Sequence, residues 1–300
     1  MKKTLFILFL IFSLASNAQQ DPLYSQYQFN QLMINPAYAG MYGRFSASGI
    51  SRFQWAGIEG APITNTLSAH TGLKNETIGI GGILLNDRFG VSNNYEIQFI
   101  GSYFIKYQQA KLGMGIQGGY TQFGYSFSDV NFDYLDDPEI VYNHSNVHKP
   151  NFGVGFMYMS EDLFLGFSIP RILNATVSDG MINSERYKRH YYFSAGFVKE
   201  INRMPYKVMG LVRSMNGETI STDISGSIQL DDIVWTGMTI RDLRHFGLFA
   251  ILDLSETLRV GYSFELPSNA LVYGQYGTHE ISLQFDVRPT RKNIFRYKYF

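Results

Sequence analysis

The feature that most constrains this chain is a strict alternation of apolar and polar residues, which returns along most of its length. In residues 278–287 the apolar set is Ile281, Leu283, Phe285 and Val287, and the polar set between them is Glu280, Ser282, Gln284 and Asp286. Residues 256–266 and 63–73 show the same period of two. Successive side chains of a β-strand point to opposite faces, so the pattern predicts strands with one apolar and one polar face.

About fourteen segments have the length and pattern of such strands, and together they predict an all-β antiparallel fold. Their approximate ranges are 44–56, 61–73, 76–87, 92–107, 110–123, 150–160, 163–169, 188–201, 205–213, 217–230, 233–240, 244–253, 256–266 and 276–287. The twelfth segment, residues 244–253, is apolar on both faces.

The length of each gap depends on whether it follows an odd-numbered or an even-numbered segment. After even-numbered segments the gaps are tight, as at Lys74-Asn75 and Glu161-Asp162, whereas the long gaps 124–149, 170–187 and 267–275 all follow odd-numbered ones. Outer-membrane barrels have short periplasmic turns at one rim and longer external loops at the other. A soluble sandwich has no reason to segregate loop length in this way. We therefore predict a transmembrane antiparallel β-barrel of about 14 strands, with both ends in the periplasm.

The first eighteen residues have the features of a secretory signal peptide. Lys2 and Lys3 precede an apolar run from Leu5 to Leu14, and small residues before and at Ala18 favour cleavage there. The alternative, a membrane-anchoring helix, would need about 20 apolar residues. No later segment reaches the length of a membrane-spanning helix either, which leaves strands to form the mature fold.

Composition narrows the classes of function. The 25 basic and 25 acidic residues balance, and this argues against nucleic acid as a partner because phosphate binding needs a basic excess. The chain has no Cys, so disulfides, thiolate catalysis and Cys-ligated metals are excluded. The 21 Tyr, 24 Phe and 29 Gly suit a barrel wall, which uses aromatic girdles at its interfaces and glycine where strands curve.

Two patterns that can signal chemistry have a simpler interpretation here. Gly113, Gly115 and Gly118 match the spacing of a dinucleotide-binding loop, but they lie inside a period-two strand instead of between a strand and a helix. Ser68 and His70 are two apart on one strand, a poor geometry for a base to reach a nucleophile. We interpret the glycines as part of a curved wall strand and the histidine as a luminal or rim residue, and we predict no enzyme activity and no cofactor.

The long gap 124–149 contains residues that could bind a metal ion. His144 and His148 lie four apart, downstream of several carboxylates: Asp133, Asp136, Asp137 and Glu139. No helix is evident to bring both imidazoles to one face, and the ordered spacing of a calcium loop is absent. We expect a solvated loop and no metal.

Two segments flank the predicted wall of residues 44–287. Residues 19–43 read as irregular or partly helical and are long enough to fold into the lumen as a plug, although a loop with a proline-initiated turn after Asn35 would also fit. The residues that mark this plug are Asp21, Pro22, Tyr24, Asn35, Pro36, Tyr38 and Gly40. Residues 288–300 form a basic and aromatic tail, predicted to be periplasmic.

The opening stretch, DPLYSQYQFNQLMINPAYAG at residues 21–40, resembles the start of the PorP/SprF family of the type IX secretion system of Bacteroidota. Similar stretches follow at residues 149–158 (KPNFGVGFMY), 165–170 (LGFSIP), 259–264 (RVGYSF) and 277–283 (GTHEISL). The resemblance therefore covers almost the whole mature chain. One departure is the end of the last strand, Gln284-Phe-Asp-Val, where the family more often has Gly-Tyr-Asp-Phe.

The resemblance implies a fourteen-stranded outer-membrane barrel without catalytic activity. It implies a role in secreting, or retaining at the cell surface, large adhesin-like proteins that carry a type B C-terminal sorting domain; gliding-motility adhesins are the familiar example. The expected partners are that sorting domain, periplasmic or lipoprotein components of the secretion machinery, and outer-membrane lipid, with no nucleic acid. No functional residues are carried over from the family.

Three other functions stay open at this point. A FadL-like transporter of hydrophobic small molecules is the main alternative, since that family also combines fourteen strands with an N-terminal plug containing Asn-Pro-Ala, here Asn35-Pro36-Ala37. A continuous apolar pocket in the lumen or a lateral opening between strands would favour it. A barrel lipase would need Ser, His and a polar orienting group near the outer rim, and a soluble β-protein would partition into water.

Overall fold

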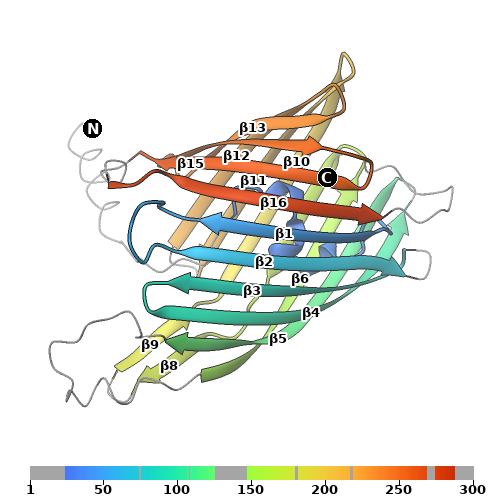
Figure 1. The fold of residues 1–300 in the computed structure, drawn as a ribbon. Helices are drawn as coiled ribbons and strands as arrows, with labels where there is room; N and C mark the ends of the chain where they lie inside the picture. The colour runs from blue at the N-terminus through green and yellow to red at the C-terminus, as the bar shows by residue number, and fades with distance from the viewer. Residues whose placement is uncertain are drawn as a thin grey trace, which may run out of the picture.

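The computed structural model describes residues 24–73, 76–107, 109–125, 147–179, 182–216, 219–268 and 274–287. Fourteen antiparallel strands close into a barrel, because β1 pairs with β16 from Phe45 opposite Val287 to Phe53 opposite His279 (Figure 1). The predicted all-β barrel of 14 strands is confirmed. The wall strands are β1 (Phe45–Phe53), β2 (Ile63–Leu73), β3 (Ile78–Phe89), β4 (Ser92–Tyr107), β5 (Ala110–Tyr125), β6 (Val147–Ser160), β7 (Leu163–Ile169), β10 (His190–Ile201), β11 (Met204–Met215), β12 (Thr219–Leu230), β13 (Val234–Arg241), β14 (His245–Asp253), β15 (Leu258–Pro267) and β16 (Thr278–Val287).

Two further strands stand apart from the wall. β8 (Ala175–Asp179) and β9 (Ile182–Tyr187) form their own two-stranded sheet between β7 and β10 in sequence, within residues 170–187, which the sequence predicted as a long external loop. Each strand is only five or six residues long, too short for alternation to reveal it. The Thr, Val and Ile residues of these two strands nevertheless have high β propensity.

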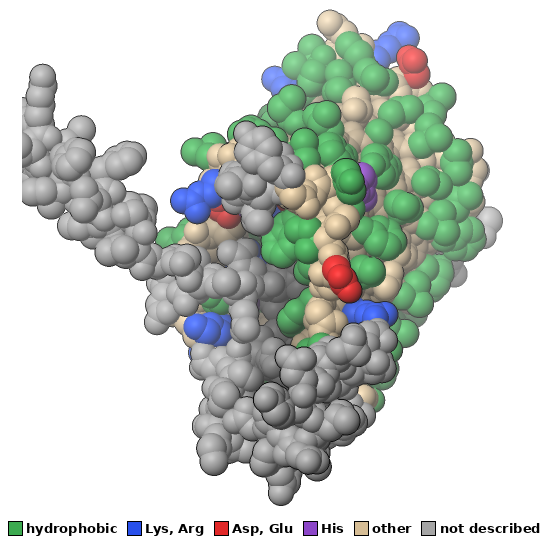
Figure 2. All heavy atoms as spheres, turned by 60° about the vertical axis from the view of Figure 1, so that its left-hand side comes forward, with side chains coloured by type: hydrophobic (Ala, Val, Ile, Leu, Met, Phe, Trp, Pro, Cys, Tyr) green, Lys and Arg blue, Asp and Glu red, His purple; other side chains and the backbone are tan. Residues whose placement is uncertain are grey.

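The faces of the wall are reversed relative to a soluble barrel. On β2, Leu67 is 55% exposed, while its neighbour Thr66, which points into the barrel, is 5% exposed. Figure 2 shows hydrophobic side chains spread over much of the outer surface in that view. Outward apolar and inward polar residues are the pattern of a barrel that faces lipid on its outside.

The two rims differ in their connections. Short turns join strands at the rim where β1 begins and β16 ends, which we call the short-turn rim; residues 202–203 and 231–233 are examples. Asn202 and Arg203 both have positive φ, as do Asp231 and Asp232, and this is the conformation of the type I′ turns that match strand twist. The longest connections, including the β8–β9 hairpin, lie at the opposite, long-loop rim. Short turns mark the periplasmic side of such barrels.

Inside the barrel lies an irregular stretch with three 3₁₀ turns: η1 (Tyr27–Phe29), η2 (Gln31–Met33) and η3 (Pro36–Tyr38) (Figure 1). Its apolar side chains and inward residues of the wall form the largest buried cluster, which includes Leu32, Ile34, Phe104, Met157 and Phe164. None of the helices in the described ranges has the length and apolar character that crossing a membrane requires.

Candidate functional site

Residues 24–43, which we call the luminal segment, are the part of the chain that the barrel surrounds. The marked residues Tyr24, Asn35, Pro36, Tyr38 and Gly40 are all buried. Asp21 and Pro22 lie outside the described residues, as do the predicted signal peptide and the basic tail. Contacts of the segment reach wall strands from β1 to β7 and from β11 to β16, so it is held from nearly all sides.

Asn35 fixes the turn at η3 and ties it to the wall. Its Oδ1 accepts a hydrogen bond from the backbone nitrogen of Ala37 at 2.9 Å, which caps the 3₁₀ turn that Pro36 begins. Its Nδ2 donates to the carbonyl oxygens of Phe156 at 3.0 Å and Phe167 at 3.5 Å. The amide of Asn35 therefore accepts a hydrogen bond from its own turn and donates hydrogen bonds to the backbone of β6 and β7.

The wall makes room for this turn with inward-facing glycines. A Cβ on Gly115 would lie 2.6 Å from the Cα of Ala37, and one on Gly155 would overlap the side chain of Asn35. Gly113 also faces the segment, at the carbonyl of Ala37, whereas Gly118 faces outward against Phe152. Two of the three glycines that match the spacing of a dinucleotide-binding loop, Gly113 and Gly115, thus allow the luminal segment to pack closely against β5.

The end of the segment is fixed by polar side chains of the wall. Gly40 donates its backbone N–H to Nδ1 of His70 at 3.1 Å, and the carbonyl of Ala39 accepts from Ser102 Oγ at 2.5 Å. The ring of Tyr38 packs edge-on against His70, with 5.4 Å between centroids. Burial raises the pKa of Tyr38, so its hydroxyl stays protonated. His70 is therefore engaged with the segment and makes no hydrogen bond to Ser68 among the described residues.

The beginning of the segment is held by carboxylates. Glu280 accepts the backbone N–H groups of Ser25 at 2.7 Å and Gln26 at 3.2 Å, and the Ser25 hydroxyl donates to Glu265 at 2.8 Å. Arg52 forms buried ion pairs with both carboxylates. Buried charges are tolerated when they are paired and hydrogen-bonded in this way.

A second charged group lies beside η1. The ammonium of Lys207 is 4.0 Å from the ring centroid of Phe29 and 4.9 Å from that of Trp235, within the range of a cation–π contact. Phe29 also packs edge-on against Trp235 and Phe249. This contact explains why β14 is apolar on both faces: its inward side meets the luminal segment.

At the long-loop rim, residues 170–174 are bound to inward-facing side chains of the wall. The carbonyl of Pro170 accepts from Gln117 at 2.9 Å, and Arg171 pairs with Glu96 at 2.7 Å. Asn151 brackets Leu173, donating to its carbonyl at 2.8 Å and accepting from its N–H at 3.1 Å. The β8–β9 hairpin that follows therefore starts from a fixed point, and in the described part of the chain each of its strands has one edge without a neighbouring strand.

Of the candidate metal ligands, His148 alone lies within the described residues; Asp133, Asp136, Asp137, Glu139 and His144 lie outside them. His148 faces outward beside the ring of Tyr120, 5.9 Å between centroids. Over the described ranges, no group of three or more His, Cys, Asp or Glu side chains is placed to hold a metal ion.

Sequence reasoning did not single out the residues that hold the segment's beginning. The sequence indicates only that three charged residues lie on the polar faces of three strands: Arg52, Glu265 and Glu280. Such charges face the lumen of an outer-membrane barrel, but their grouping depends on the closure of β1 against β16, which brings residues 228 positions apart into contact.

Comparison with solved structures finds outer-membrane barrels at low sequence identity. Omp33 of Acinetobacter baumannii is 11% identical with a TM-score of 0.48, and the match covers 83% of this chain and 100% of that one. The KdgM porin is 11% identical with a TM-score of 0.39, covering 81% and 99%. A mutant of the Rh. blastica porin is 9% identical with a TM-score of 0.34, covering 81% and 98%.

Comparison with curated proteins finds no match. Among protein-family models, the type IX secretion system membrane protein PorP/SprF matches residues 16–285. The match extends over the luminal segment and nearly all of the wall, and the strands form a closed barrel with a lipid-facing outer surface. The protein is therefore an outer-membrane β-barrel associated with type IX secretion, and the chain belongs to the PorP/SprF family.

Proposed function

We propose that this protein is a non-enzymatic component that supports the secretion or surface attachment of an adhesin-like cargo with a type B C-terminal sorting domain. The family match over residues 16–285 supports the link to type IX secretion. The observation that carries the mechanism is the occupied lumen. A barrel of fourteen strands that holds a bound segment is a poor conduit for a large cargo, so its contribution is recognition.

In this proposal the luminal segment is a plug. Its support is the pattern of contacts described above: carboxylates at its beginning, glycines around Asn35 and Pro36, and backbone hydrogen bonds to Ser102 and His70 at its end. These contacts come from opposite sides of the wall and hold the segment across the lumen. Displacing it would leave several buried charged and polar groups without partners.

The proposed cargo site is the long-loop rim, at residues 124–149 and 170–187. The β8–β9 hairpin favours this region because free strand edges can pair with an added strand of a partner, so that main-chain hydrogen bonds supply affinity. The anchoring of residues 170–174 presents these edges at a set position. Periplasmic or lipoprotein partners would meet the opposite rim, where the luminal segment connects to β1 and the tail of residues 288–300 leaves β16.

The transporter alternative finds no support in the described residues. Each neighbouring pair of wall strands is hydrogen-bonded in the described ranges. The shortest pairings, β6 with β7 and β7 with β10, span six residues each, so no two neighbouring strands are fully separated. The inward faces are largely polar or covered by the luminal segment, so no continuous apolar pocket runs through the lumen.

The proposal is tested by deleting the gene in the native host and comparing surface and secreted proteins by mass spectrometry, with the intact chain restored as a control. We expect a large protein with a C-terminal sorting domain to disappear from the surface and to accumulate in the periplasm. An unchanged surface proteome, with reduced uptake of a hydrophobic compound, would reject the proposal in favour of transport.

Asn151 allows a test of the rim itself. Asn151→Ala removes all of its hydrogen bonds to Leu173 and Phe152, whereas Asn151→Asp loses only the donation to the Leu173 carbonyl. We expect surface cargo per folded barrel to fall most for Asn151→Ala and less for Asn151→Asp. Wild-type cargo levels in both variants would argue against a site at the hairpin.

A further inference from the structure

The outward face of the barrel wall carries almost no charge. In the described wall strands, alternation places only two Lys, Arg, Asp or Glu side chains on that face: Arg88 near the end of β3 and Lys199 near the end of β10. β3 ends at the long-loop rim and β10 at the short-turn rim. Within the described strands, Arg88 is therefore the one such residue that faces outward at the external side, where the headgroups of the outer leaflet lie.

Arg88 lines a hollow against the outside of the wall, which we call the rim hollow. It has a volume of about 450 Å³ and lies between the ends of β1, β2 and β3 and the connection of residues 54–62. Its lining includes the exposed apolar side chains of Phe53, Ile58 and Ile63. Arg88 is itself exposed, and it is the one charged residue in this lining. The rim hollow thus joins a cationic group to an apolar surface.

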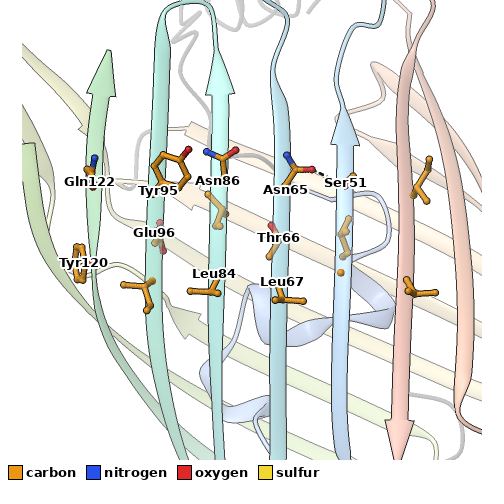
Figure 3. Close-up of a pocket in the computed structure, with 16 residues that line it drawn as sticks. Ser51, Asn65, Thr66, Leu67, Leu84, Asn86, Tyr95, Glu96, Tyr120 and Gln122 are labelled. Carbon is orange, nitrogen blue, oxygen red and sulfur yellow. Dashed lines mark hydrogen bonds between the residues drawn. The ribbon is translucent and has the colours of Figure 1, made fainter. Parts of the chain in front are cut away.

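The outward side chains become less polar from the rim hollow toward the middle of the wall. Along β3 they are, in order, Arg88, Asn86 and Leu84. Asn65 on β2 lies opposite Asn86, and Ser51 on β1 lies opposite Asn65. Figure 3 shows these three polar side chains next to one another on neighbouring strands. A charged group, then amides, then apolar side chains is the order that matches a membrane lipid from its headgroup to its acyl chains.

The amides of Asn65 and Asn86 keep unused hydrogen-bonding capacity. Ser51 Oγ donates to Asn65 Oδ1 at 2.8 Å, and Asn86 Nδ2 donates to Asn93 Oδ1 at 2.7 Å. Among the described residues, Asn65 Nδ2 and Asn86 Oδ1 have no hydrogen-bond partner. An amide that faces hydrocarbon is costly when its hydrogen bonds are not made. A ligand with both donors and acceptors would satisfy the two groups.

A second hollow, which we call the wall hollow, lies next along the same strands. It has a volume of about 690 Å³, and its lining includes Gly49, Leu67 and Leu84 (Figure 3). On each of β1, β2 and β3 its lining begins two residues from that of the rim hollow. Gly49 keeps it open, because nothing lies within 4 Å of the position that a Cβ would take. The wall hollow therefore offers apolar space below the polar groups.

We propose that the two hollows bind a phosphorylated glycolipid of the outer leaflet, lipid A. Arg88 pairs with a phosphate, Asn65 and Asn86 bind hydroxyl or amide groups of the sugars, and an acyl chain lies in the wall hollow beside Gly49. A guanidinium suits phosphate oxygens because it can donate two parallel hydrogen bonds. Sugar hydroxyl groups both donate and accept hydrogen bonds, as the two amides do.

A glycerophospholipid satisfies this face less completely than a glycolipid. The phosphate and ester oxygens of its backbone only accept hydrogen bonds. They can pair with Arg88 and with the donor of Asn65, but they leave the acceptor of Asn86 unmatched. The external position of Arg88 also favours the lipid of the outer leaflet.

Binding is measured on the purified protein, freed of bound lipid in detergent, by adding purified lipid A and following the midpoint of thermal unfolding. A ligand that binds the folded state raises this midpoint. Arg88→Gln should weaken binding about tenfold or more, because a hydrogen bond to a charged group is lost. Lys199→Gln is the matched control, since it removes the other outward cation, at the short-turn rim, and should bind lipid A as the wild type does.

Two further comparisons test the proposed contacts. Dephosphorylated lipid A should bind the wild type as weakly as lipid A binds Arg88→Gln, and the two changes together should weaken binding no further, because they remove the same interaction. Gly49→Leu fills the wall hollow and should reduce binding. Gly226→Leu, at an equally open outward glycine on β12, should not.

The proposal is overturned if lipid A does not stabilise the wild type, if Arg88→Gln binds it as well as Lys199→Gln does, or if phosphatidylglycerol binds as tightly as lipid A. Native mass spectrometry of protein extracted from outer membranes gives a second measurement. The mass of one lipid A should stay bound to the wild type and be lost from Arg88→Gln. A phospholipid or a second copy of the chain in its place would contradict the proposal. These outcomes do not depend on cargo secretion.

Discussion

At the residue scale, close packing of the luminal segment against wall glycines holds it in place, as do its hydrogen bonds. Asn35 makes three hydrogen bonds, but it reaches its partners only because Gly115, Gly155 and Gly166 have no side chains. A packed interior tolerates added volume poorly, since neighbouring atoms must move or leave their preferred rotamers.

Gly115→Ala should therefore destabilise the protein. The new Cβ would overlap Ala37, and overpacking of this kind costs about 1–3 kcal/mol. Gly101→Ala is the control: Gly101 faces outward on β4 with nothing within 4 Å. The urea midpoint of the purified protein in detergent should fall for Gly115→Ala and stay near wild type for Gly101→Ala. Equal midpoints for the two variants would contradict the packing described here.

The sequence could indicate some of these residues and not others. Asn35 and Pro36 stood out because an Asn-Pro pair announces a turn. The role of Gly115 did not, because its partner Ala37 is 78 positions away and a glycine in a strand predicts curvature as readily as close packing. Arg52 and Glu280 are even further apart, at 228 positions, so their contact could not be predicted from the sequence either.

At the element scale, the luminal segment depends on β16 for its beginning. A single carboxylate, Glu280, binds two backbone N–H groups of the segment and also Arg52. Removing one partner of a buried ion pair costs about 3–5 kcal/mol, because the other charge is left uncompensated. An exposed pair contributes only about 0–1 kcal/mol.

Glu280→Gln should thus lower the urea midpoint much more than Asp253→Asn does. Asp253 pairs with Arg259 at 2.6 Å, but both side chains are partly exposed at the short-turn rim. Limited proteolysis should also cut the Glu280→Gln variant within the luminal segment while the barrel stays intact. If the two variants unfold at the same midpoint, the carboxylate does not anchor the segment.

The wall strands were predictable from sequence because lipid on one side and a polar lumen on the other impose alternation on each of them. β4 and β7 were predicted with the ends that the structure shows, 92–107 and 163–169. The β8–β9 hairpin was missed because its strands stand apart from the wall and are only five and six residues long. Its position depends on tertiary bonds, such as those of Asn151 to Leu173.

At the scale of the whole molecule, two patterns were enough to predict a closed outer-membrane barrel and its number of strands. They are the alternation of apolar and polar residues and the difference in loop length after odd and even strands. They could not predict how the lumen is filled, since the luminal segment has no periodic pattern and forms only short 3₁₀ turns. The occupied lumen supports our central proposal, in which the protein recognises cargo at its rim and does not conduct it.

The most direct measurement of this claim is secretion by a barrel whose luminal segment is locked in place. Asn30 Nδ2 lies 3.0 Å from Ser68 Oγ on β2, so a short, reducible thiol-specific crosslinker can join Asn30→Cys to Ser68→Cys in a chain without other cysteines. Each single variant, and reduction of the double variant, serves as a control. The account predicts that the locked barrel supports as much surface cargo as the single variants do. Secretion that stops on locking and returns on reduction would show that the segment must leave the lumen, and would contradict it.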